Sequence, residues 1–367
     1  MSATLEQRLQ DVVTSVVPLD AEAMADARRR QTQLTKPAGA LGVLEDASVK
    51  LCGIQRTCPP RRLALPVVAV FAGDHGVHAH GVSPWPQEVT ASMVANFRAG
   101  GAAVSVLARQ TGVEVAVVDM GVAADLEPGP DLFDHKIRRG TSDLADGPAM
   151  TREEALTGLL AGISVADALV DRGHDVLLTG DMGIANTTPS AALVAAFTGA
   201  DPAEVTGRGT GVDDTVLARK VGVIARALEA RPVTEDPVET LASVGGFEHA
   251  GLAGFVLGAA RRGVPVILDG VIAGAAALVA QVLAGDVVGY CFAGHRSVEP
   301  GHAVALARLG LRPLVDLDLR LGEGTGAVLA LPIVEAAGAT LREMATFDSA
   351  GVAHKEAGVA HKEESDG

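Results

Sequence analysis

The hydrophobic positions of this chain follow two patterns, short continuous apolar runs and longer segments in which apolar residues recur every three or four positions. A short run bounded by glycine or a polar residue is typical of a strand buried on both faces, whereas the longer periodic segments are typical of amphipathic helices. Strands are expected at 67–71, 113–118, 175–179, 264–268, 287–292 and 313–317. Helices are expected between most of them, at 87–110, 152–172, 214–230, 249–262 and 273–283.

Alternating strands and helices indicate right-handed βαβ crossovers and a parallel sheet. We therefore expect an α/β fold with a Rossmann-like parallel sheet of about six strands, flanked by helices. Each expected strand ends in polar or glycine residues, as at Gly73–Gly76 and at Gly180-Asp181. The carboxyl ends of parallel strands share one edge of the sheet, so a single ligand site is expected there.

The two ends of the chain differ from the middle. Residues 1 to about 62 are polar and periodic, and they predict helices at 5–17, 21–34 and 44–55. Near the other end, the seven residues Ala350–Glu356 are repeated as Ala357–Glu363. Two copies cannot build a repeat architecture, so we expect a solvated or frayed terminus there.

Composition narrows the kind of core and the kind of partner. Apolar residues make up 48% of the 367 residues but aromatic residues only 3%, so the core must be mainly aliphatic. The formal net charge is −15, and no block of Lys and Arg offers a footprint for nucleic acid. We therefore expect no nucleic-acid partner, and an anionic ligand must be held by a local site against the overall field.

Cysteine usage and targeting signals indicate the compartment. The odd number of cysteines (Cys52, Cys58 and Cys291) argues against a disulfide framework and favours a reducing environment. The first residues show no signal-peptide pattern, and the most apolar segment, 271–285, is too short to span a bilayer. We expect a cytoplasmic protein with no membrane partner.

Glycine-rich clusters carry most of the candidate chemistry. Gly180–Pro189 and Leu321–Ala327 each follow an apolar run and lead into an expected helix, where free backbone N–H groups can face an anion. A third cluster, 207–214, has the alternating glycines of an anion-binding nest, although tight turns use the same residues. Lys220 follows this cluster and is a candidate phosphate partner, the alternative being an ordinary surface lysine.

Two absences weaken common nucleotide-binding hypotheses. No Gly-Lys dipeptide occurs, so the chain has no Walker A phosphate loop. No Gly-x-Gly-x-x-Gly follows an expected strand, which argues against a nicotinamide-dinucleotide dehydrogenase. The remaining hypothesis is an enzyme that handles a phosphorylated small molecule.

Glu323 is the candidate general base. A carboxylate between Gly322 and Gly324, after a strand and before a helix, can approach a ligand without a bulky neighbour. Burial in an apolar pocket would raise the pKa of this carboxyl and make it a usable base near neutral pH. The alternative is an acidic residue that complements the dipole of the following helix.

The histidines that follow the first expected strand suggest a metal site only superficially. His75, His78 and His80 stand at positions i, i+3 and i+5, a spacing that suits neither one helix face nor one strand face. We expect no metal here, and ligand contact or loop structure instead.

Several long motifs, taken in order, resemble one enzyme family. They are Thr35–Glu45, Gly73–Val77, Gly81–Thr90, Asn96–Ala103, Gly180–Pro189, Gly209–Asp214, Ala293–Ser297 and Leu321–Ala327. Together they resemble the nicotinate-nucleotide–dimethylbenzimidazole phosphoribosyltransferases, which assemble the lower ligand of cobalamin. The likeness runs from about residue 31 to residue 352.

This resemblance implies a reaction and an architecture. The reaction joins nicotinate mononucleotide and 5,6-dimethylbenzimidazole to give α-ribazole 5′-phosphate and nicotinate, and no step of it calls for a metal or another cofactor. The architecture is a homodimer whose large α/β domain, 63–332, is joined by a small helical domain from both chain ends, 1–62 and 333–367.

The resemblance also assigns site residues. It implies Glu323 as the catalytic base, with Asp181 as a secondary electrostatic group. The expected phosphate and ribose contacts are Gly183, Asn186, Thr187, Thr188, Gly209, Lys220 and Gly322, of which Gly209 and Gly322 come from the glycine clusters themselves. A flat slot for the aromatic base is expected from Ser83, Trp85 and Met93, which could equally pack under a loop.

Two departures and three alternatives stay open at this point. The family more often carries glutamate and glycine where this chain has Asp181 and Ala185. Ala185 must therefore adopt a negative φ or strain the loop by about 1 kcal/mol. The alternatives to the transferase are a nucleotide N-glycosidase, or a transferase for a different aromatic base, and a nucleotide-binding regulatory module without turnover.

Overall fold

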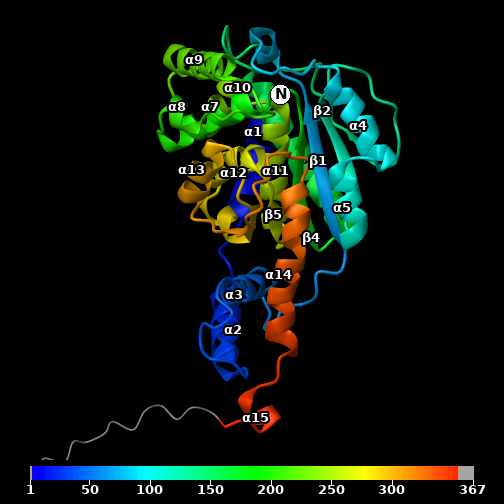
Figure 1. The fold of residues 1–367 in the computed structure, drawn as a ribbon, viewed down its shortest axis with the longest axis vertical. Helices are drawn as coiled ribbons and strands as arrows, with labels where there is room; N and C mark the ends of the chain where they lie inside the picture. Colours follow the sequence, from blue (N-terminus) through cyan, green and yellow to red (C-terminus); the bar gives the residue numbers. More distant parts are fainter. Residues whose placement is uncertain (1, 354–367) are drawn as a thin grey trace, which may run out of the picture.

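A computed structural model describes residues 2–353 and builds them around one parallel sheet (Figure 1). The second copy of the repeated heptad and the end of the first lie outside the described residues. The sheet contains β1 (Pro66–Gly73), β2 (Glu114–Gly121), β3 (Leu132–Asp134), β4 (Val176–Met182), β5 (Val266–Leu268), β6 (Cys291–His295) and β7 (Pro313–Val315). All neighbouring strands pair in parallel.

The strand order indicates where a ligand site is expected. It runs β3-β2-β1-β4-β5-β6-β7, so the chain builds outward from β1 in one direction and resumes at β4 on its other side. The point between β1 and β4 is the topological switch point, where ligands of open α/β sheets typically bind. The expected α/β fold with a parallel, Rossmann-like sheet is confirmed.

Helices cover both faces of the sheet, as the residues of β1 show. Phe71 packs edge-on against Phe255 of α11 (Phe247–Arg261), with ring centroids 5.2 Å apart. Val68 instead lies against Gly324, in the loop that starts α14 (Thr325–Glu343). Because successive strand residues point to opposite faces, α11 and α14 lie on opposite sides. Near α11 are α6 (Arg152–Asp171) and α12 (Val271–Leu283), and near α14 is α5 (Ala103–Thr111).

The remaining helices are shorter or lie at the periphery. They are α1 (Ser2–Ser15), α2 (Ala21–Gln33), α3 (Val43–Gln55), η1 (Gly76–His80), α4 (Val89–Ala99), α7 (Thr187–Thr198), α8 (Pro202–Val205), α9 (Asp214–Ala230), α10 (Pro237–Val244), η2 (Gly285–Tyr290), α13 (Pro300–Leu309) and α15 (Phe347–Ala350).

Three of the expected elements need correction. The sheet has seven strands rather than about six, because three-residue β3 pairs with β2 from a loop that contains no apolar run. The expected helix 87–110 is two helices, since Gly100 adopts φ +78 and ends α4. The expected strand at 287–292 begins only at Cys291, and the residues before it form η2.

A small helical unit extends from the sheet domain (Figure 1). It consists of α2, α3 and the second half of α14, with its own apolar cluster of Ala23, Ala27, Leu34, Val49, Cys52 and Leu341. By contrast, α1 contacts α6 and α11, and its Leu9, Val12 and Val16 belong to the main core. We therefore keep the division into two domains as a proposal, with α1 placed on the large one.

The helices of the structure are those of a protein built around a sheet. Among the described residues, none is both long and apolar enough to cross a bilayer.

Candidate functional site

The loop after β4 and the loop before α14 meet at the carboxyl edge of the sheet. Gly180 is where they touch, because a Cβ built there would lie 2.4 Å from the carbonyl oxygen of Glu323. Only a glycine lets the two backbones approach this closely. The two glycine-rich clusters of the sequence are therefore parts of one site.

The backbone around Glu323 has an unusual conformation. Gly322, Glu323 and Gly324 all adopt left-handed φ angles, of +82, +65 and +100. A left-handed glutamate costs free energy, and such strain persists only where the surroundings fix it. The flanking glycines adopt such angles without penalty, so the strain is confined to Glu323.

Asp269, at the end of β5, fixes this loop. Its carboxylate accepts hydrogen bonds from the backbone N–H groups of Gly324 (3.1 Å), Gly326 (2.7 Å) and Ala327 (3.1 Å). Asp269 thus caps the N-terminus of α14, although it precedes Gly324 by 55 residues in the chain. The sequence placed Asp269 at a strand end but gave no sign of this role.

Gly326 leaves room for a second neighbour. A Cβ at this position would lie 1.9 Å from Cδ2 of the buried His295. His295 Nε2 also lies 3.6 Å from Asp269 Oδ1, so the ring packs against the whole cap. The loop that carries Glu323 is therefore defined by β5, β6 and α14 together.

Replacing Gly326 with alanine is expected to lower the free energy of unfolding by about 1–3 kcal/mol, because the added methyl group overlaps the His295 ring. Urea denaturation measures this change. The matched control is Gly222→Ala in α9, where the nearest atom is the flexible end of Arg226 at 3.5 Å. That variant should be neutral or stabilising by about 0.5–1 kcal/mol, and equal losses in the two would contradict the packing argument.

The Glu323 carboxylate is buried, with 5% of the residue exposed. Its Oε2 accepts a hydrogen bond from the backbone N–H of Val104, in the first turn of α5, at 3.1 Å. Burial raises the pKa of this carboxyl, the Val104 N–H lowers it, and the charge of Asp269 raises it further, with a net upward shift. A carboxylate in this state can accept a proton near neutral pH.

Asp181 lies beside Glu323. Its carboxylate oxygens are 3.1 and 3.3 Å from the position that a Cβ on Gly322 would occupy. Burial, first, and the charges of Asp269, Glu248 and Glu323 raise the pKa of Asp181 well above its usual value, against a hydrogen bond from Asn186 Nδ2 at 2.9 Å. Asp181, Asp269 and Glu323 form a buried group of carboxyls that favours a positively charged ligand.

A cationic subsite lies where Lys220 of α9 meets the first residue of α7. Lys220 is 1% exposed, and its Nζ donates to Thr187 Oγ1 and to the carbonyl of Gly207, each at 2.9 Å. Burial lowers the pKa of Lys220 to about 8, although the charge of Glu299 opposes the shift. Gly209 lies next to both side chains, because a Cβ built on it would be 3.0 Å from Thr187 Oγ1 and 3.6 Å from Lys220 Nζ.

The start of α7 adds donors to this subsite. Thr187 and Thr188 are its first two residues, and Thr188 Oγ1 is buried without a hydrogen-bond partner among the described residues. Gly183 precedes them, where a Cβ would lie 2.3 Å from the carbonyl oxygen of Gly73. A lysine, a helix N-terminus and a glycine-rich approach are together suited to a phosphate group.

Ala185 takes the strained of the two conformations that the sequence left open, with φ +76. The Ala185→Gly variant is expected to raise the free energy of unfolding by up to about 1 kcal/mol, because glycine occupies this region without penalty. Thermal or urea unfolding measures the change. Ala195→Gly, in the regular part of α7, should instead destabilise by about 1 kcal/mol, and matching signs would argue against strain at 185.

The residues expected to hold an aromatic base lie on and before α4. The backbone N–H of Trp85 donates to Ser83 Oγ at 3.3 Å, and its carbonyl lies 2.8 Å from His78 Nε2. Trp85 is 50% exposed, while Met93 is partly buried against the core. No contact recorded among the described residues joins these three to Glu323, so their role stays a prediction.

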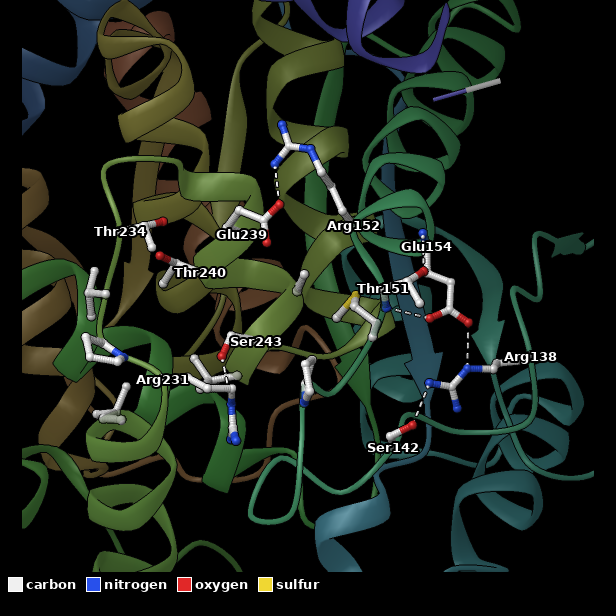
Figure 2. Close-up of a pocket in the computed structure, with 17 residues that line it drawn as sticks. Arg138, Ser142, Thr151, Arg152, Glu154, Arg231, Thr234, Glu239, Thr240 and Ser243 are labelled. Atoms are coloured by element: carbon white, nitrogen blue, oxygen red, sulfur yellow. Dashed lines mark hydrogen bonds and ion pairs between the residues drawn. The ribbon is translucent and has the colours of Figure 1, made fainter. Parts of the chain in front are cut away.

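A cavity of about 400 Å³ lies apart from this site, between the start of α6, the end of α9 and α10 (Figure 2). It contains none of the predicted site residues. Two of its arginines are paired with carboxylates, Arg138 with Glu154 at 2.6 Å and Arg152 with Glu239 at 3.0 Å. The candidate chemistry therefore lies at the carboxyl edge of the sheet rather than in this cavity.

The histidine-rich segment after β1 is divided between two environments. His75 is 1% exposed and pairs with Glu248 at 2.9 Å. His80 pairs with Asp143 at 2.7 Å, and Asp146 lies close by. Among the described residues, His80, Asp143 and Asp146 are the one group with metal-ligand spacing, and they are partly or fully exposed.

Sequence reasoning missed several buried groups of the site. Besides Asp269, these are Glu248 and His249 of α11, and Glu299, which accepts a hydrogen bond from the Gly209 N–H at 2.7 Å. Glu248 and His249 lie within an otherwise apolar helical pattern. Two adjacent ionisable residues in such a helix are a sequence signal for buried functional groups.

Known proteins resemble this chain closely. A family model described as Phosphoribosyltransferase matches residues 16–352. The nicotinate-nucleotide–dimethylbenzimidazole phosphoribosyltransferase of Salinispora tropica is 58% identical over 362 residues, covering 95% of this chain and 100% of that protein. Its namesake from Chloroflexus aggregans is 55% identical over 348 residues, covering 95% and 98%. A crystal structure of the Thermus thermophilus namesake has a TM-score of 0.88 at 48% identity, covering 92% and 100%.

Proposed function

The chain belongs to the phosphoribosyltransferase family, and we propose that it transfers the phosphoribosyl group of nicotinate mononucleotide to 5,6-dimethylbenzimidazole. The products are α-ribazole 5′-phosphate and nicotinate, which places the enzyme in assembly of the cobalamin nucleotide loop. The observation that carries this proposal is a buried carboxylate of raised pKa, Glu323, next to the β4 loop, whose following helix α7 begins with Thr187, the partner of the buried Lys220.

The leaving group needs no acid catalyst. Nicotinate bound through its ring nitrogen is a pyridinium, so it departs with the electron pair of the breaking bond as a neutral ring nitrogen. Before it departs, the ring is positively charged, and the cluster of three buried carboxyls (Asp181, Asp269 and Glu323) favours such a charge. Chemistry can therefore proceed by positioning the two rings and the sugar.

The acceptor does need a base. The unprotonated nitrogen of the benzimidazole attacks the anomeric carbon from the opposite face, which inverts β to α. Positive charge develops on the ring and its other N–H becomes acidic. In this proposal Glu323 accepts that proton, and the raised pKa of the carboxyl supports the transfer near neutral pH.

The 5′-phosphate and ribose are assigned to the subsite around Lys220. Nζ of Lys220, the Thr187 and Thr188 hydroxyls and the N–H groups at the start of α7 would bind the phosphate. The ribose would lie against Gly183, Gly209, Gly322 and Asn186. Asp181 would act as a secondary electrostatic group. Ser83, Trp85 and Met93 are proposed for the aromatic base.

We also propose a cytoplasmic homodimer. Val298, Leu317 and Leu321 are 46%, 57% and 57% exposed. Leu317 and Leu321 lie on the loop that precedes Glu323, and Val298 lies on the loop between β6 and α13. The backbone N–H of Val298 donates to the carbonyl of Leu319 at 3.2 Å, so these loops form one surface. An apolar surface of this kind favours coverage by a second copy, which light scattering after gel filtration would measure.

The function is tested by mixing purified protein with nicotinate mononucleotide and 5,6-dimethylbenzimidazole. Released nicotinate is quantified by chromatography, and the anomer of the product is assigned by NMR. Formation of α-ribazole 5′-phosphate is the expected result. Release of ribose 5-phosphate without a new nucleotide would instead identify an N-glycosidase, and binding without turnover would identify a regulatory module.

A further inference from the structure

A chain of buried polar groups, side chains apart from the backbone carbonyl of Asn186, connects the end of β1 to the end of β4. It runs from His75 through Glu248, His249, Ser190 and Asn186 to Asp181. Each of these residues is less than a tenth exposed. Polar groups are costly to bury, and a connected set of them beside a site calls for an explanation beyond packing.

Glu248 is the centre of this chain. It lies in the first turn of α11, and its Oε1 is 2.9 Å from both His75 Nε2 and His249 Nδ1. Burial opposes the charged form of both groups. The two imidazoles nevertheless lower the pKa of Glu248, and the charge of Glu248 raises the pKa of His75. The stable arrangement is a carboxylate held by at least one imidazolium.

The space around the centre is enclosed by backbone. A Cβ at Gly246 would lie 2.5 Å from His75 Cε1 and 2.6 Å from Glu248 Oε2. A Cβ at Gly73 would lie 3.2 Å from the same oxygen. The rings and the carboxylate are therefore fixed in place by neighbouring glycines rather than free to reorient.

Ser190 connects this centre to the proposed substrate loop. Its Oγ lies 2.8 Å from His249 Nε2 and 2.7 Å from the carbonyl oxygen of Asn186. Asn186 in turn donates from Nδ2 to Asp181 Oδ2 at 2.9 Å. The Ser190 hydroxyl has one proton. It can donate that proton to the Asn186 carbonyl only while His249 Nε2–H donates to the hydroxyl oxygen, so His249 sets the direction of these hydrogen bonds.

We propose that Glu248, His75, His249 and Ser190 are positioning residues that hold the Asn186–Thr188 turn, and through Asn186 the Asp181 carboxyl, in the geometry that receives the nucleotide. This inference rests on the proposed function. None of the four needs to touch the reacting atoms. The chain also explains how the left-handed Ala185 persists, because Asn186 next to it is held by Ser190 on one side and Asp181 on the other.

The first test is Ser190→Ala, which removes one hydroxyl from a helix. We expect the Michaelis constant for nicotinate mononucleotide to rise about fivefold to tenfold, with that for dimethylbenzimidazole unchanged. The matched control is Thr198→Val in the same helix, which removes a similar hydroxyl bond to Val194, at 2.6 Å, away from the site. Equal Michaelis constants for the two variants would overturn the proposal.

The second test is spectroscopic and does not depend on turnover. The groups that face His75 are Glu248 and Asp74, with the His249 ring at 6.2 Å between centroids. Nitrogen-15 NMR at pH 7 should show His75 as an imidazolium in the wild type and as a neutral ring in Glu248→Gln, because the compensating charge is gone. A neutral His75 in the wild type would contradict the network.

These readouts separate two failures. An inactive wild-type protein in which His75 is an imidazolium would refute the proposed function and leave the network standing. An active wild type in which Ser190→Ala behaves like Thr198→Val would refute the network alone. Should Glu248→Gln not fold, the Ser190→Ala comparison and the wild-type spectrum still decide.

Discussion

Replacing Glu323 with glutamine is expected to lower kcat for nicotinate release by about 10²–10⁴-fold, with little change in either Michaelis constant. Glutamine keeps the shape of the side chain and can still face the Val104 N–H, but it cannot accept the proton that the benzimidazole loses. Steady-state kinetics with chromatographic detection of nicotinate measures the effect. Unchanged turnover would remove Glu323 from the mechanism.

The pH profile provides the sign of the effect. A base must be ionised to act, so wild-type kcat should rise with pH through the raised pKa of Glu323 and then level off. The residual activity of Glu323→Gln should lack that rise. The matched control is Glu335→Gln, in the same helix, because burial also raises the pKa of Glu335 but it lies away from the site. Its profile should follow the wild type.

The same substitution should not weaken the fold. A carboxyl whose pKa is raised in the folded state binds more protons there than in the unfolded chain, so its contribution to stability falls as pH rises between the two pKa values. Above that window the ionised Glu323 is a net cost, which glutamine removes. We therefore expect an equal or higher Tm for Glu323→Gln at pH 8, together with the loss of activity.

Much of the fold could be predicted because its elements are long and periodic. The helix expected at 214–230 has the same limits in the structure, and the strand expected at 175–179 forms the core of β4. The incorrect predictions concern elements that the local sequence pattern does not determine. β3 exists only because it pairs with β2, and the break between α4 and α5 depends on one left-handed glycine in a helical pattern.

The site could be predicted in part for a related reason. Loops at the carboxyl ends of parallel strands must share an edge, so one site was expected there, and the structure brings the backbones of Gly180 and Glu323 together at that edge. Side-chain burial is not contained in such an argument. The sequence pattern of α9 does not reveal that Lys220 is only 1% exposed. The sequence around Asp269 likewise does not reveal that its carboxylate caps the distant helix α14.

The Lys220→Met variant is expected to raise the Michaelis constant for nicotinate mononucleotide by about 10- to 100-fold, with a smaller effect on kcat. A charge-assisted contact to phosphate would be lost, whereas the base at Glu323 would be untouched. The matched control is Lys50→Met, a lysine whose pKa burial also lowers but which donates to the carbonyl of Val288, outside the site. That variant should leave both Michaelis constants unchanged.

Stability and binding should respond to Lys220→Met in opposite directions. The pKa of Lys220, lowered to about 8, means that the folded chain disfavours the ammonium by roughly 3 kcal/mol below that pH, a cost that a bound phosphate dianion would offset. The unfolded chain keeps its proton up to higher pH, so this cost fades as pH rises from about 8. Methionine removes the cost at neutral pH but leaves the Thr187 and Gly207 oxygens without their donor. We expect an unchanged or higher Tm without ligand.

Wild-type affinity for the nucleotide should show the matching pH dependence. Because the ammonium form binds phosphate, affinity should fall as pH rises above about 8 in the wild type, and this fall should be absent from Lys220→Met. Calorimetric titration with nicotinate mononucleotide across this range measures both. A phosphate subsite elsewhere in the protein would instead give two parallel profiles, with Lys220→Met binding as tightly as Lys50→Met.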